Sequence, residues 1–340
     1  MEGSPRSVPA VEVTAPYRAD FAGGTLDIWP LGMLEDHALT VNAALPVRIR
    51  VRVDDGAPAG QVIHSLGNDQ GRVLRPEDAA DNLTAAVAFH LRPGGGIRVR
   101  VLEQAPIGSG LGGSSAYAVA VAKALLTVQE LSMEAKRLVA LLRDLEARVL
   151  RTATGIQDYW AALLGGVLAL HVEPGGERVE RLSVPEDWLG ARCSVFFTGL
   201  THSSGMVNWQ VFRRRLEGDE RTAAALTRIS QAAGRCREAL LARDAAGVAE
   251  AINAEWKARR RLAPEVCPAD LDRMIDAAIE AGASAVKACG AGGGGSLLIW
   301  HEPEHRETVI AALGAAAPAG KVLARGVSSK GCSVARLPAQ

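Results

Sequence analysis

Two segments of the first third of the chain alternate apolar and basic residues. Residues 47–53 read VRIRVRV and residues 97–102 read IRVRVL. A period of two places the apolar side chains on one face of a strand and the charged ones on the other. Strands with one solvated face are typical of an antiparallel or mixed sheet. An earlier strand is predicted at residues 8–14, followed by a turn at Ala15–Pro16.

Helical periodicity follows these strands. Residues 114–128 are rich in Ala, Val and Leu and predict a buried helix, whereas residues 133–150 repeat Leu and Val every three or four positions, as an amphipathic helix does. A short helix is predicted to open at Asp158 and to end at two glycines. Residues 167–172 and 178–184 then flank a Pro-Gly-Gly turn and predict a hairpin.

The second half of the chain contains both segments with the two-residue period of a strand and segments with the helical period of three to four residues. A strand is predicted at residues 193–198, and helices over residues 206–281 with breaks near Gly218, Asp244 and Pro264. Shorter segments complete the pattern: strand 285–289, strand 297–300, helix 303–313, strand 322–325 and strand 333–337. A length of 340 residues suggests two domains, and we place the boundary between residues 188 and 189. The fold class predicted is α+β.

Composition narrows the function. The chain has 38 basic and 38 acidic side chains and only 4% aromatic residues, so neither its charge nor a stacking surface favours nucleic acid. Its five cysteines show no metal-ligand spacing and favour reduced thiols in a cytoplasmic protein. No run is apolar and long enough for a membrane span, and the N-terminus lacks an apolar signal core. We therefore expect neither a nucleic acid nor a membrane as a partner.

The most informative segment is a glycine-rich loop between a predicted strand and a predicted helix. Glycines allow backbone to approach a phosphate, and a helix start offers unpaired N–H groups and the positive end of a dipole. Ser114 and Ser115 are placed to cap that helix, and one hydroxyl is a candidate Mg²⁺ ligand. The predicted phosphate-binding residues are Pro106, Gly108, Ser109, Gly110, Leu111, Gly112, Gly113, Ser114 and Ser115.

Two other phosphate motifs are excluded. No Lys follows the glycines, so the loop is not a Walker A motif, and it lies too late in the chain for a dinucleotide fingerprint. A second cluster, residues 290–295, follows Lys287 and contains four consecutive glycines. Alone it would be a flexible surface loop; beside the first loop, it suggests another place where backbone approaches a ligand.

Three ordered segments together resemble the GHMP kinases, the superfamily of galactokinase and of homoserine, mevalonate and phosphomevalonate kinases. They are residues 15–24 with Asp27, residues 106–116 and residues 287–295. The resemblance covers nearly the whole chain. It implies an N-terminal domain (1–188) like ribosomal protein S5, a ferredoxin-like C-terminal domain (189–340), and an active site in the cleft between them.

One branch of that superfamily is favoured. Galactokinases carry a Glu-His pair where this chain has Gly24 and Thr25. The first segment looks more like heptose phosphate kinases and bacterial fucokinase-like proteins. Residues 155–159 (GIQDY) and 255–262 (EWKARRRL) resemble the heptose kinases as well. The resemblance implies ATP-dependent phosphorylation of a sugar or sugar phosphate.

The same resemblance assigns catalytic roles to Asp158 and Arg18. Asp158 would orient the substrate hydroxyl and accept its proton, and Arg18 would lie near it or near the transferring phosphoryl group. From the residues alone, a helix cap is the better interpretation of Asp158, and a solvated strand residue is the simpler interpretation of Arg18; the resemblance reverses the first of these. A Mg²⁺ site is expected at Ser115 and Glu146, with Asp144 as a competing ligand and a solvated carboxylate as the simpler reading of Glu146.

Substrate contacts are expected from both halves of the chain. His202, Ser203 and Ser204 are further candidates to line the cleft, and Lys257–Arg261 is a basic run that would hold a phosphate or simply face solvent. The expected substrate-binding residues are Gly23, Gly24, Thr25, Asp27, Gly292, Gly293 and Arg261.

Other functions stay open at this point. They are a GHMP-type kinase of a non-sugar metabolite, a decarboxylase of the same fold, and a catalytically silent sensor. The oligomeric state is also open, a homodimer included.

Overall fold

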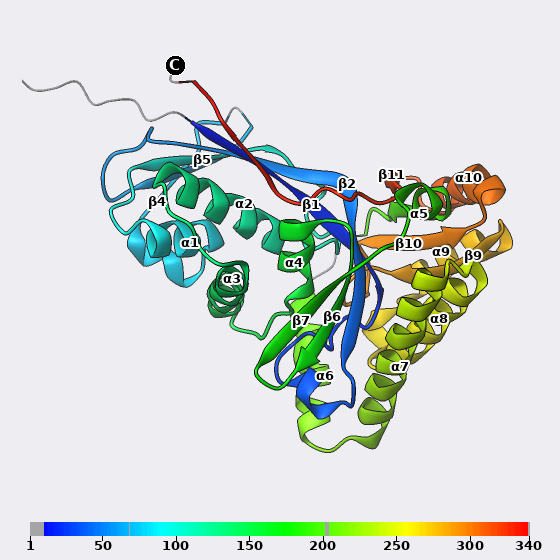
Figure 1. The fold of residues 1–340 in the computed structure, drawn as a ribbon. Helices are drawn as coiled ribbons and strands as arrows, with labels where there is room; N and C mark the ends of the chain where they lie inside the picture. The colour runs from blue at the N-terminus through cyan, green and yellow to red at the C-terminus, as the bar shows by residue number, and fades with distance from the viewer. Residues whose placement is uncertain (1–9, 68, 201–203, 339–340) are drawn as a thin grey trace, which may run out of the picture.

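The computed structural model describes residues 10–67, 69–200 and 204–338, the side chains of 204–207 excepted. Its larger sheet has eight strands, in the order β12-β1-β2-β5-β3-β4 with the β6–β7 hairpin paired to β2 (Figure 1). These strands are β1 (Val11–Ala22), β2 (Leu39–Asp54), β3 (Val62–Leu66), β4 (Arg72–Leu74), β5 (Ile97–Glu103), β6 (Val167–Glu173), β7 (Gly176–Leu182) and β12 (Ser333–Arg336).

Different parts of strand β2 pair with two different strands of the sheet. Residues 39–43 pair with β6, whereas residues 50–54 pair with β5. The second part keeps the predicted alternation of buried and more exposed positions, while residues 39–45 are all buried. A strand covered on both faces has no polar side to alternate with, which is why the sequence pattern revealed only the second part.

The predicted turn at Ala15–Pro16 is wrong. Strand β1 continues through it to Ala22, and its pairing with β2 shifts register between Pro16 and Arg18 and again between Asp20 and Ala22. Proline and closely spaced glycines usually end a strand, but a bulge accommodates proline by leaving a residue out of the ladder. The longer strand carries Arg18 and Asp20 into the middle of the molecule.

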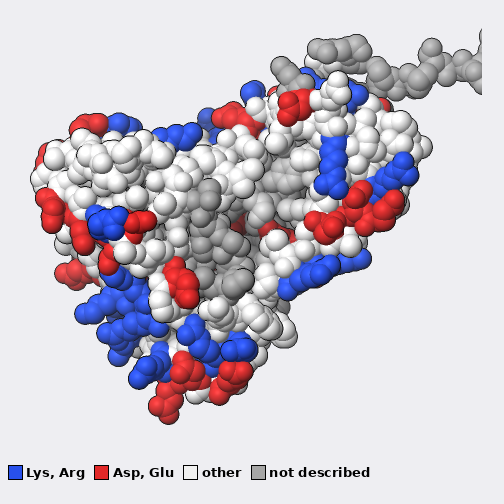
Figure 2. Space-filling model, turned by 180° about the vertical axis from the view of Figure 1, so that it is seen from behind, with Lys and Arg blue, Asp and Glu red and all other residues white. Residues whose placement is uncertain are grey.

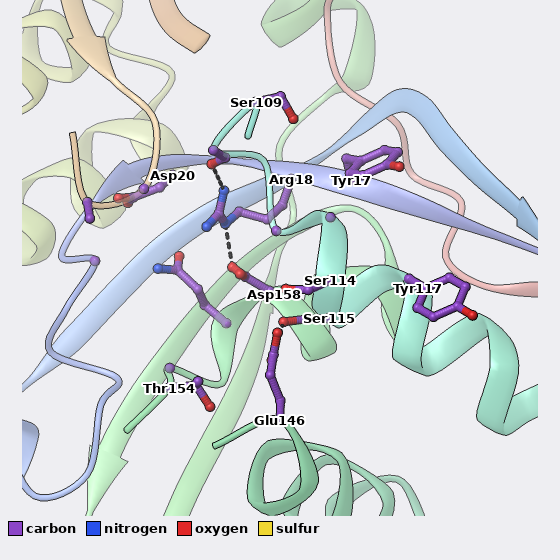
Figure 3. Close-up of a pocket in the computed structure, with 18 of the residues that line it drawn as sticks. Tyr17, Arg18, Asp20, Ser109, Ser114, Ser115, Tyr117, Glu146, Thr154 and Asp158 are labelled. Carbon is purple, nitrogen blue, oxygen red and sulfur yellow. Dashed lines mark hydrogen bonds and ion pairs between the residues drawn. The ribbon is translucent and has the colours of Figure 1, made fainter. Parts of the chain in front are cut away.

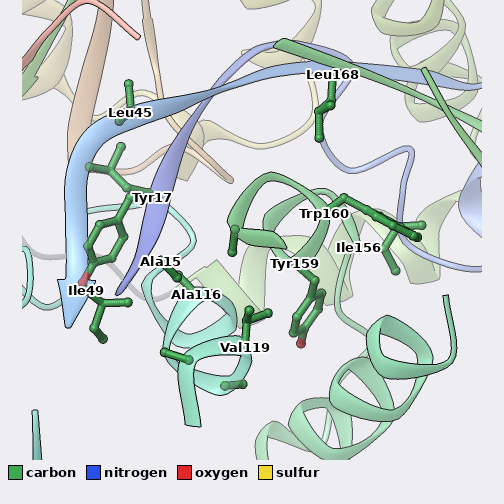
Figure 4. Packing of buried hydrophobic residues seen from close by; sticks show 14 of the residues in the cluster. Ala15, Tyr17, Leu45, Ile49, Ala116, Val119, Ile156, Tyr159, Trp160 and Leu168 are labelled. Carbon is green, nitrogen blue, oxygen red and sulfur yellow. The ribbon is translucent and has the colours of Figure 1, made fainter. Parts of the chain in front are cut away.

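Helices of the first half pack against this sheet (Figure 1). They are α1 (Leu83–Leu91), α2 (Gly113–Val128), α3 (Ala135–Leu150) and α4 (Gln157–Leu164). Ala116 and Val119 of α2 are buried against the strand residues of the core, and Tyr159 and Trp160 of α4 are buried beside them (Figure 4). Helix α1 was not predicted, because most of its nine residues are apolar and show no amphipathic period.

The second half builds a smaller antiparallel sheet in the order β11-β8-β10-β9. Its strands are β8 (Cys193–Phe197), β9 (Ala283–Ala288), β10 (Ser296–His301) and β11 (Lys321–Arg325). With helices between β8 and β9 and between β10 and β11, this is the predicted ferredoxin-like arrangement. The structure therefore has the two-domain architecture expected; the exact boundary at 188/189 stays a prediction.

Six helices accompany the smaller sheet, and the breaks predicted near Gly218, Asp244 and Pro264 are confirmed. The helices are α5 (Glu186–Arg192), α6 (Ser204–Leu216), α7 (Glu220–Ala242), α8 (Ala245–Arg259), α9 (Ala269–Glu280) and α10 (Arg306–Ala316). Short 3-10 turns occur at Leu31–Leu34, Pro76–Ala80, Pro264–Val266 and Pro303–His305.

The C-terminal strand links the two halves. β12 leaves the second half and pairs antiparallel with β1 at the edge of the larger sheet (Figure 1). Among the described residues, no helix combines the length and the apolar character that a membrane crossing requires.

Candidate active site

A cavity of about 440 Å³ lies where the two halves meet. Most of its wall comes from the first half: β1, the loop after it, the glycine-rich loop, and the segment before α4 (Figure 3). The second half contributes Asn208 of α6 and the glycine cluster residues Gly290 and Ala291. The cavity is thus in the place that the family resemblance implies.

Arg18 and Asp158 form an ion pair inside this cavity. Arg18 Nε lies 2.6 Å from Asp158 Oδ1, and Arg18 Nη1 donates a hydrogen bond of 2.7 Å to the Gly110 carbonyl (Figure 3). Arg18 is buried, whereas the Asp158 side chain keeps 21% of its surface exposed. Neither Arg18 Nε nor Asp158 Oδ1 has an aligned hydrogen bond among the described residues, so charge attraction holds the pair together.

Burial raises the pKa of Asp158 above the usual value for aspartate, although the Arg18 guanidinium acts in the opposite direction. A carboxyl with a raised pKa holds a proton more readily than a surface aspartate does. The arrangement therefore suits a group that accepts a proton from a hydroxyl near neutral pH.

Asp158 is not the cap of its helix. The cap comes from Asp27, whose Oδ2 accepts hydrogen bonds from the backbone N–H groups of Ile156 (2.7 Å) and Gln157 (2.9 Å). Burial, with Asp158 and Asp20 nearby, raises the pKa of Asp27 to about 6. Asp27 lines the cavity as predicted, and it also fixes the first turn of α4, from which Asp158 projects.

The glycine-rich loop has the backbone that its sequence predicts. Gly108, Gly110 and Gly112 all have positive φ. A Cβ added at Gly112 would lie 2.7 Å from Asp158 Cγ, and one at Gly110 would lie 2.9 Å from the Cys289 carbonyl oxygen. Glycine at these positions lets the loop lie directly against the ion pair and against the second half of the chain.

Contrary to expectation, neither serine caps α2. The helix begins after Gly112, and no side chain accepts a hydrogen bond at its N-terminus. Ser115 instead donates to Glu146 Oε2 at 3.0 Å. The first N–H groups of α2 therefore stay available to a phosphate.

Leu111 differs from its neighbours in the loop. Its side chain is fully buried, and its carbonyl accepts the N–H of Arg18 at 3.1 Å. It anchors the loop to β1 and does not line the cavity. The predicted loop residues that line it are Pro106, Gly108, Ser109, Gly110, Gly112, Gly113, Ser114 and Ser115.

The second glycine cluster supports the first loop. A Cβ at Gly295 would lie 2.8 Å from the Ser109 carbonyl oxygen, so these glycines allow the two loops to approach each other. Gly292 and Gly293 pack instead against Val266, to whose carbonyl Gly293 N–H donates at 2.7 Å. Gly292 and Gly293, which were predicted to contact the substrate, therefore do not line the cavity. Gly290 and Ala291 of the same cluster line it instead.

Of the two carboxylates considered as metal ligands, Glu146 is buried and Asp144 is exposed. Glu146 accepts hydrogen bonds from Ser115 and Tyr159, both at Oε2, and burial raises its pKa. Asp144 is largely exposed and pairs with Arg143. No Lys or Arg among the described residues pairs with Glu146, so this buried carboxylate suits a cation. The described residues hold no group of three His, Cys, Asp or Glu side chains arranged for a metal.

A second charged cluster is sealed behind the cavity wall. Lys287 Nζ lies 3.3 Å from Asp20 Oδ2 and 3.0 Å from Glu255 Oε2, and all three side chains are fully buried. Arg259 Nε donates to Glu255 Oε1 at 2.8 Å. We call these four residues the sealed cluster. Burial opposes ionisation of Asp20, but Lys287, Arg259 and Arg18 together lower its pKa.

The sealed cluster holds the loop after β1. Arg259 donates to the Gly24 carbonyl at 2.6 Å and to Thr25 Oγ1 at 3.1 Å, and Thr25 has a positive φ of 82°. Gly24 and Thr25 line the cavity, as predicted, whereas Gly23 packs against Leu39 and Ala233 outside it.

The basic run 257–261 does not reach the cavity. Arg261 is exposed, Arg260 pairs with Asp272 at 2.7 Å, and Lys257 is exposed. None of these residues lines the cavity, so the assignment of Arg261 to the substrate finds no support in the structure. His202 and Ser203 lie outside the described residues.

Several lining residues were not predicted, among them Tyr17, Tyr117, Thr154, Gln157 and Asn208. Tyr17 and Arg18 are neighbours in a strand and should point to opposite faces. Both line the cavity because the register shift between Pro16 and Arg18 breaks the alternation. Gln157 stands next to Asp158 in the GIQDY segment, which was the available signal for it.

Two family models match the chain. The model of the GHMP kinases N terminal domain covers residues 77–166, and that of the GHMP kinases C terminal domain covers residues 236–319. This chain belongs to the GHMP kinases. The first match contains the glycine-rich loop, Glu146 and Asp158, and the second contains Glu255, Arg259 and Lys287.

Curated relatives of this GHMP kinase include sugar kinases. The D-glycero-alpha-D-manno-heptose 7-phosphate kinase of Campylobacter jejuni is 28% identical over 212 residues, 61% of this chain and 62% of the relative. The bifunctional fucokinase/GDP-fucose pyrophosphorylase of Arabidopsis thaliana is 27% identical over 317 residues, 85% of this chain and 29% of the relative. The chain thus spans less than two thirds of each of these relatives.

Solved structures share the fold along nearly the whole chain. The D-glycero-D-manno-heptose 1-phosphate kinase from Bacteriodes thetaiotaomicron has a TM-score of 0.74 at 22% sequence identity, and the similarity covers 96% of this chain and 99% of that one. At that identity the match establishes the architecture alone.

Proposed function

We propose that this protein transfers the γ-phosphoryl group of ATP to a hydroxyl group of a sugar or sugar phosphate. The observation that carries the proposal is the Arg18–Asp158 ion pair, 2.6 Å between Nε and Oδ1, set against the glycine-rich loop in one cavity. The named activities of the curated relatives, on heptose 7-phosphate and on fucose, support the choice of a sugar.

In the proposed reaction the substrate hydroxyl oxygen attacks the γ-phosphorus, the bond from that phosphorus to the β,γ-bridging oxygen breaks, and ADP leaves. Asp158 orients the hydroxyl and takes its proton, a role to which its raised pKa is suited. Arg18 lies beside Asp158 and supports the negative charge that spreads over the phosphoryl oxygens.

The nucleotide's phosphates belong, in this proposal, at the glycine-rich loop and the uncapped start of α2. Backbone N–H groups and the helix dipole hold phosphate oxygens without requiring a lysine. The lining residues Tyr17, Tyr117, Leu83 and Ile107 offer apolar surface for the base.

The residues present fit a magnesium ion, with Ser115 and Glu146 as ligands. Mg²⁺ prefers one or two carboxylates together with phosphate oxygens and water, and Glu146 offers a buried carboxylate that no Lys or Arg of the described residues pairs with. When bound, the ion would neutralise charge on the nucleotide's phosphates. Ser115 and Glu146 already lie in hydrogen-bond contact, 3.0 Å apart, so the chain holds both ligands in place.

We place this activity in the cytoplasm. No disulfide joins cysteines in the part of the chain that the structure describes, and all five thiols are free, which is consistent with a reducing compartment.

An ATP-consumption assay with Mg²⁺ across free sugars, sugar phosphates, homoserine and mevalonate compounds tests the proposal, with product mass read in parallel. A mass gain of one phosphoryl group on a sugar is the expected result, and Asp158→Asn should lose it. Release of CO₂ and phosphate would identify a decarboxylase instead. ATP binding without turnover of any compound would indicate a sensor.

A further inference from the structure

The cavity wall carries more carboxylates than cations. Its described lining contains the carboxylates Asp27, Glu146 and Asp158 and one cationic side chain, Arg18, whereas a fourth lining carboxylate, Asp20, is already paired with Lys287 in the sealed cluster. No lysine or histidine belongs to that part of the lining. Any group that enters the cavity with ATP must therefore be compatible with an acidic wall.

The one lining cation is already engaged. Arg18 binds Asp158 through Nε and the Gly110 carbonyl through Nη1. In the proposed reaction it also faces the transferring phosphoryl group, so it has no capacity left for a second anion at the acceptor end.

The cations behind the wall are also occupied. Lys287 contacts Asp20 and Glu255, and Arg259 contacts Glu255, Gly24 and Thr25. Both side chains are almost completely buried. Drawing either one towards a ligand would break a buried ion pair with Glu255, and drawing Lys287 away would also leave Asp20 without its paired lysine; breaking a buried pair costs several kcal/mol.

The surface shows the same distribution. In Figure 2, acidic side chains are visible in the hollow in the middle of the face, and a group of Lys and Arg side chains lies below it on the left. Arg151, which follows Leu150 of the lining, is exposed and is not itself a lining residue.

We propose that the acceptor is a sugar carrying no phosphate or carboxylate group. This inference rests on the proposed kinase function and narrows its substrate class. A phosphate or carboxylate placed against Asp27 and Asp158 would lie beside groups of like charge and would be desolvated with no free cation in the described lining to pair with. Hydroxyl groups, by contrast, donate hydrogen bonds that carboxylates accept.

The inference separates this chain from one of its relatives. The Campylobacter jejuni relative is named for a 7-phosphate, whereas the Arabidopsis thaliana relative is named for fucose, which has no anionic group. The charge of the cavity favours an acceptor of the second kind.

The test is a comparison of matched acceptor pairs with the full chain, ATP and Mg²⁺. Suitable pairs are a free heptose with its 7-phosphate, mannose with mannose 6-phosphate, and glucose with glucuronate, together with fucose. The best neutral acceptor is expected to exceed every anionic one by at least about 100-fold in kcat/KM, because an unpaired desolvated charge costs several kcal/mol. ATP binding is measured alongside.

The outcomes distinguish the two proposals. If a phosphorylated or carboxylated acceptor is used as well as or better than every neutral one, the inference is wrong while the kinase function stands. If ATP binds but no sugar of either kind is phosphorylated, the kinase function is wrong and the inference falls with it.

A pair of variants checks that charge is the cause. Thr154 lines the cavity on the loop between α3 and α4 and is half-buried (Figure 3). Thr154→Lys adds a cation there, and Thr154→Met adds a similar length without charge. The lysine should raise the ratio of anionic to neutral acceptor use by about tenfold or more, and the methionine should not. An unchanged ratio in an active Thr154→Lys protein would show that charge does not select the acceptor.

Discussion

Two ion-pair clusters begin only two residues apart on β1, and they differ in exposure. Arg18 pairs with Asp158, whose side chain is 21% exposed in the cavity. Asp20 pairs with Lys287 in the sealed cluster, where both side chains are fully buried. One pair borders space that a ligand can enter; the other is closed off by protein.

The difference in exposure indicates that the two clusters have different functions. The accessible pair can exchange its partners for a substrate and a phosphoryl group, so it is suited to chemistry. The sealed cluster joins β1 of the first half to α8 and β9 of the second, and it holds the loop at Gly24 and Thr25. Since its charges are already satisfied by one another, we assign it to positioning.

The largest effect is expected at the accessible pair. Asp158→Asn should lower kcat by roughly 10²- to 10⁴-fold, because it removes the proton acceptor while keeping the shape of the side chain. Arg18→Met should lower it by about 10²- to 10³-fold through lost charge stabilisation. Initial rates at saturating ATP measure both effects. The thermal midpoint should fall as well, because each variant leaves a largely buried charge without its partner, so the rates are compared at a temperature where both variants are folded. Near-wild-type rates in both variants would contradict the mechanism.

The sealed cluster should respond in stability. Arg259→Met removes one partner of a buried pair and should lower the free energy of unfolding by about 3–5 kcal/mol. Its sequence neighbour provides the control: Arg260→Met breaks a partly exposed pair with Asp272 and should cost at most about 1 kcal/mol. Urea unfolding followed by circular dichroism compares the two. Equal losses would show that burial of the cluster does not govern its contribution.

Contact between the glycine-rich loop and Asp158 is tested by Gly112→Ala. The new Cβ would lie 2.7 Å from Asp158 Cγ, and a displacement of about 1 Å at a catalytic group can cost roughly 10²-fold in rate. Gly218→Ala is the matched control, since Gly218 also has positive φ but nothing lies near its Cβ position. Both variants should lose about 1 kcal/mol of stability through the left-handed backbone, and Gly112→Ala should lose more because of the close contact, but only Gly112→Ala should lose activity.

The sequence could predict much of this arrangement because its strongest patterns are local. Alternation marked the second part of β2 and β5, and four glycines with two serines marked the loop before α2. The motif order added Arg18, Asp27 and Asp158, all of which line the cavity.

The remainder depends on contacts between distant segments. Glu255 and Arg259 look like an ordinary helical pair at i and i+4, and nothing local shows that Lys287 and Asp20 complete a buried cluster with them. Arg259 and Arg261 cannot be told apart by composition, since only the packing of α8 buries one and exposes the other. The bulge that brings Tyr17 to the cavity is likewise a property of the paired strands.

The smallest expected effect is a pH dependence of stability caused by Asp27. Its side chain is nearly as buried as those of the sealed cluster, and it lies near both Asp158 and Asp20. Burial raises its pKa to about 6, so between about pH 4 and pH 6 the folded protein holds a proton that the unfolded chain releases. Linkage then requires that this carboxyl's contribution to stability fall as pH rises through that window, by about 1.4 kcal/mol per pH unit, and stay low above pH 6.

The variant Asp27→Asn cannot ionise and should lack this dependence. Thermal or urea unfolding of both proteins at pH 4.5, 5.5 and 6.5 gives the difference in unfolding free energy, variant minus wild type. That difference should grow more positive as pH rises, even if the asparagine is a poorer cap for α4 and lowers stability at every pH. A difference that is constant across the window would place Asp27 with the sealed cluster, as a carboxylate that stays ionised throughout.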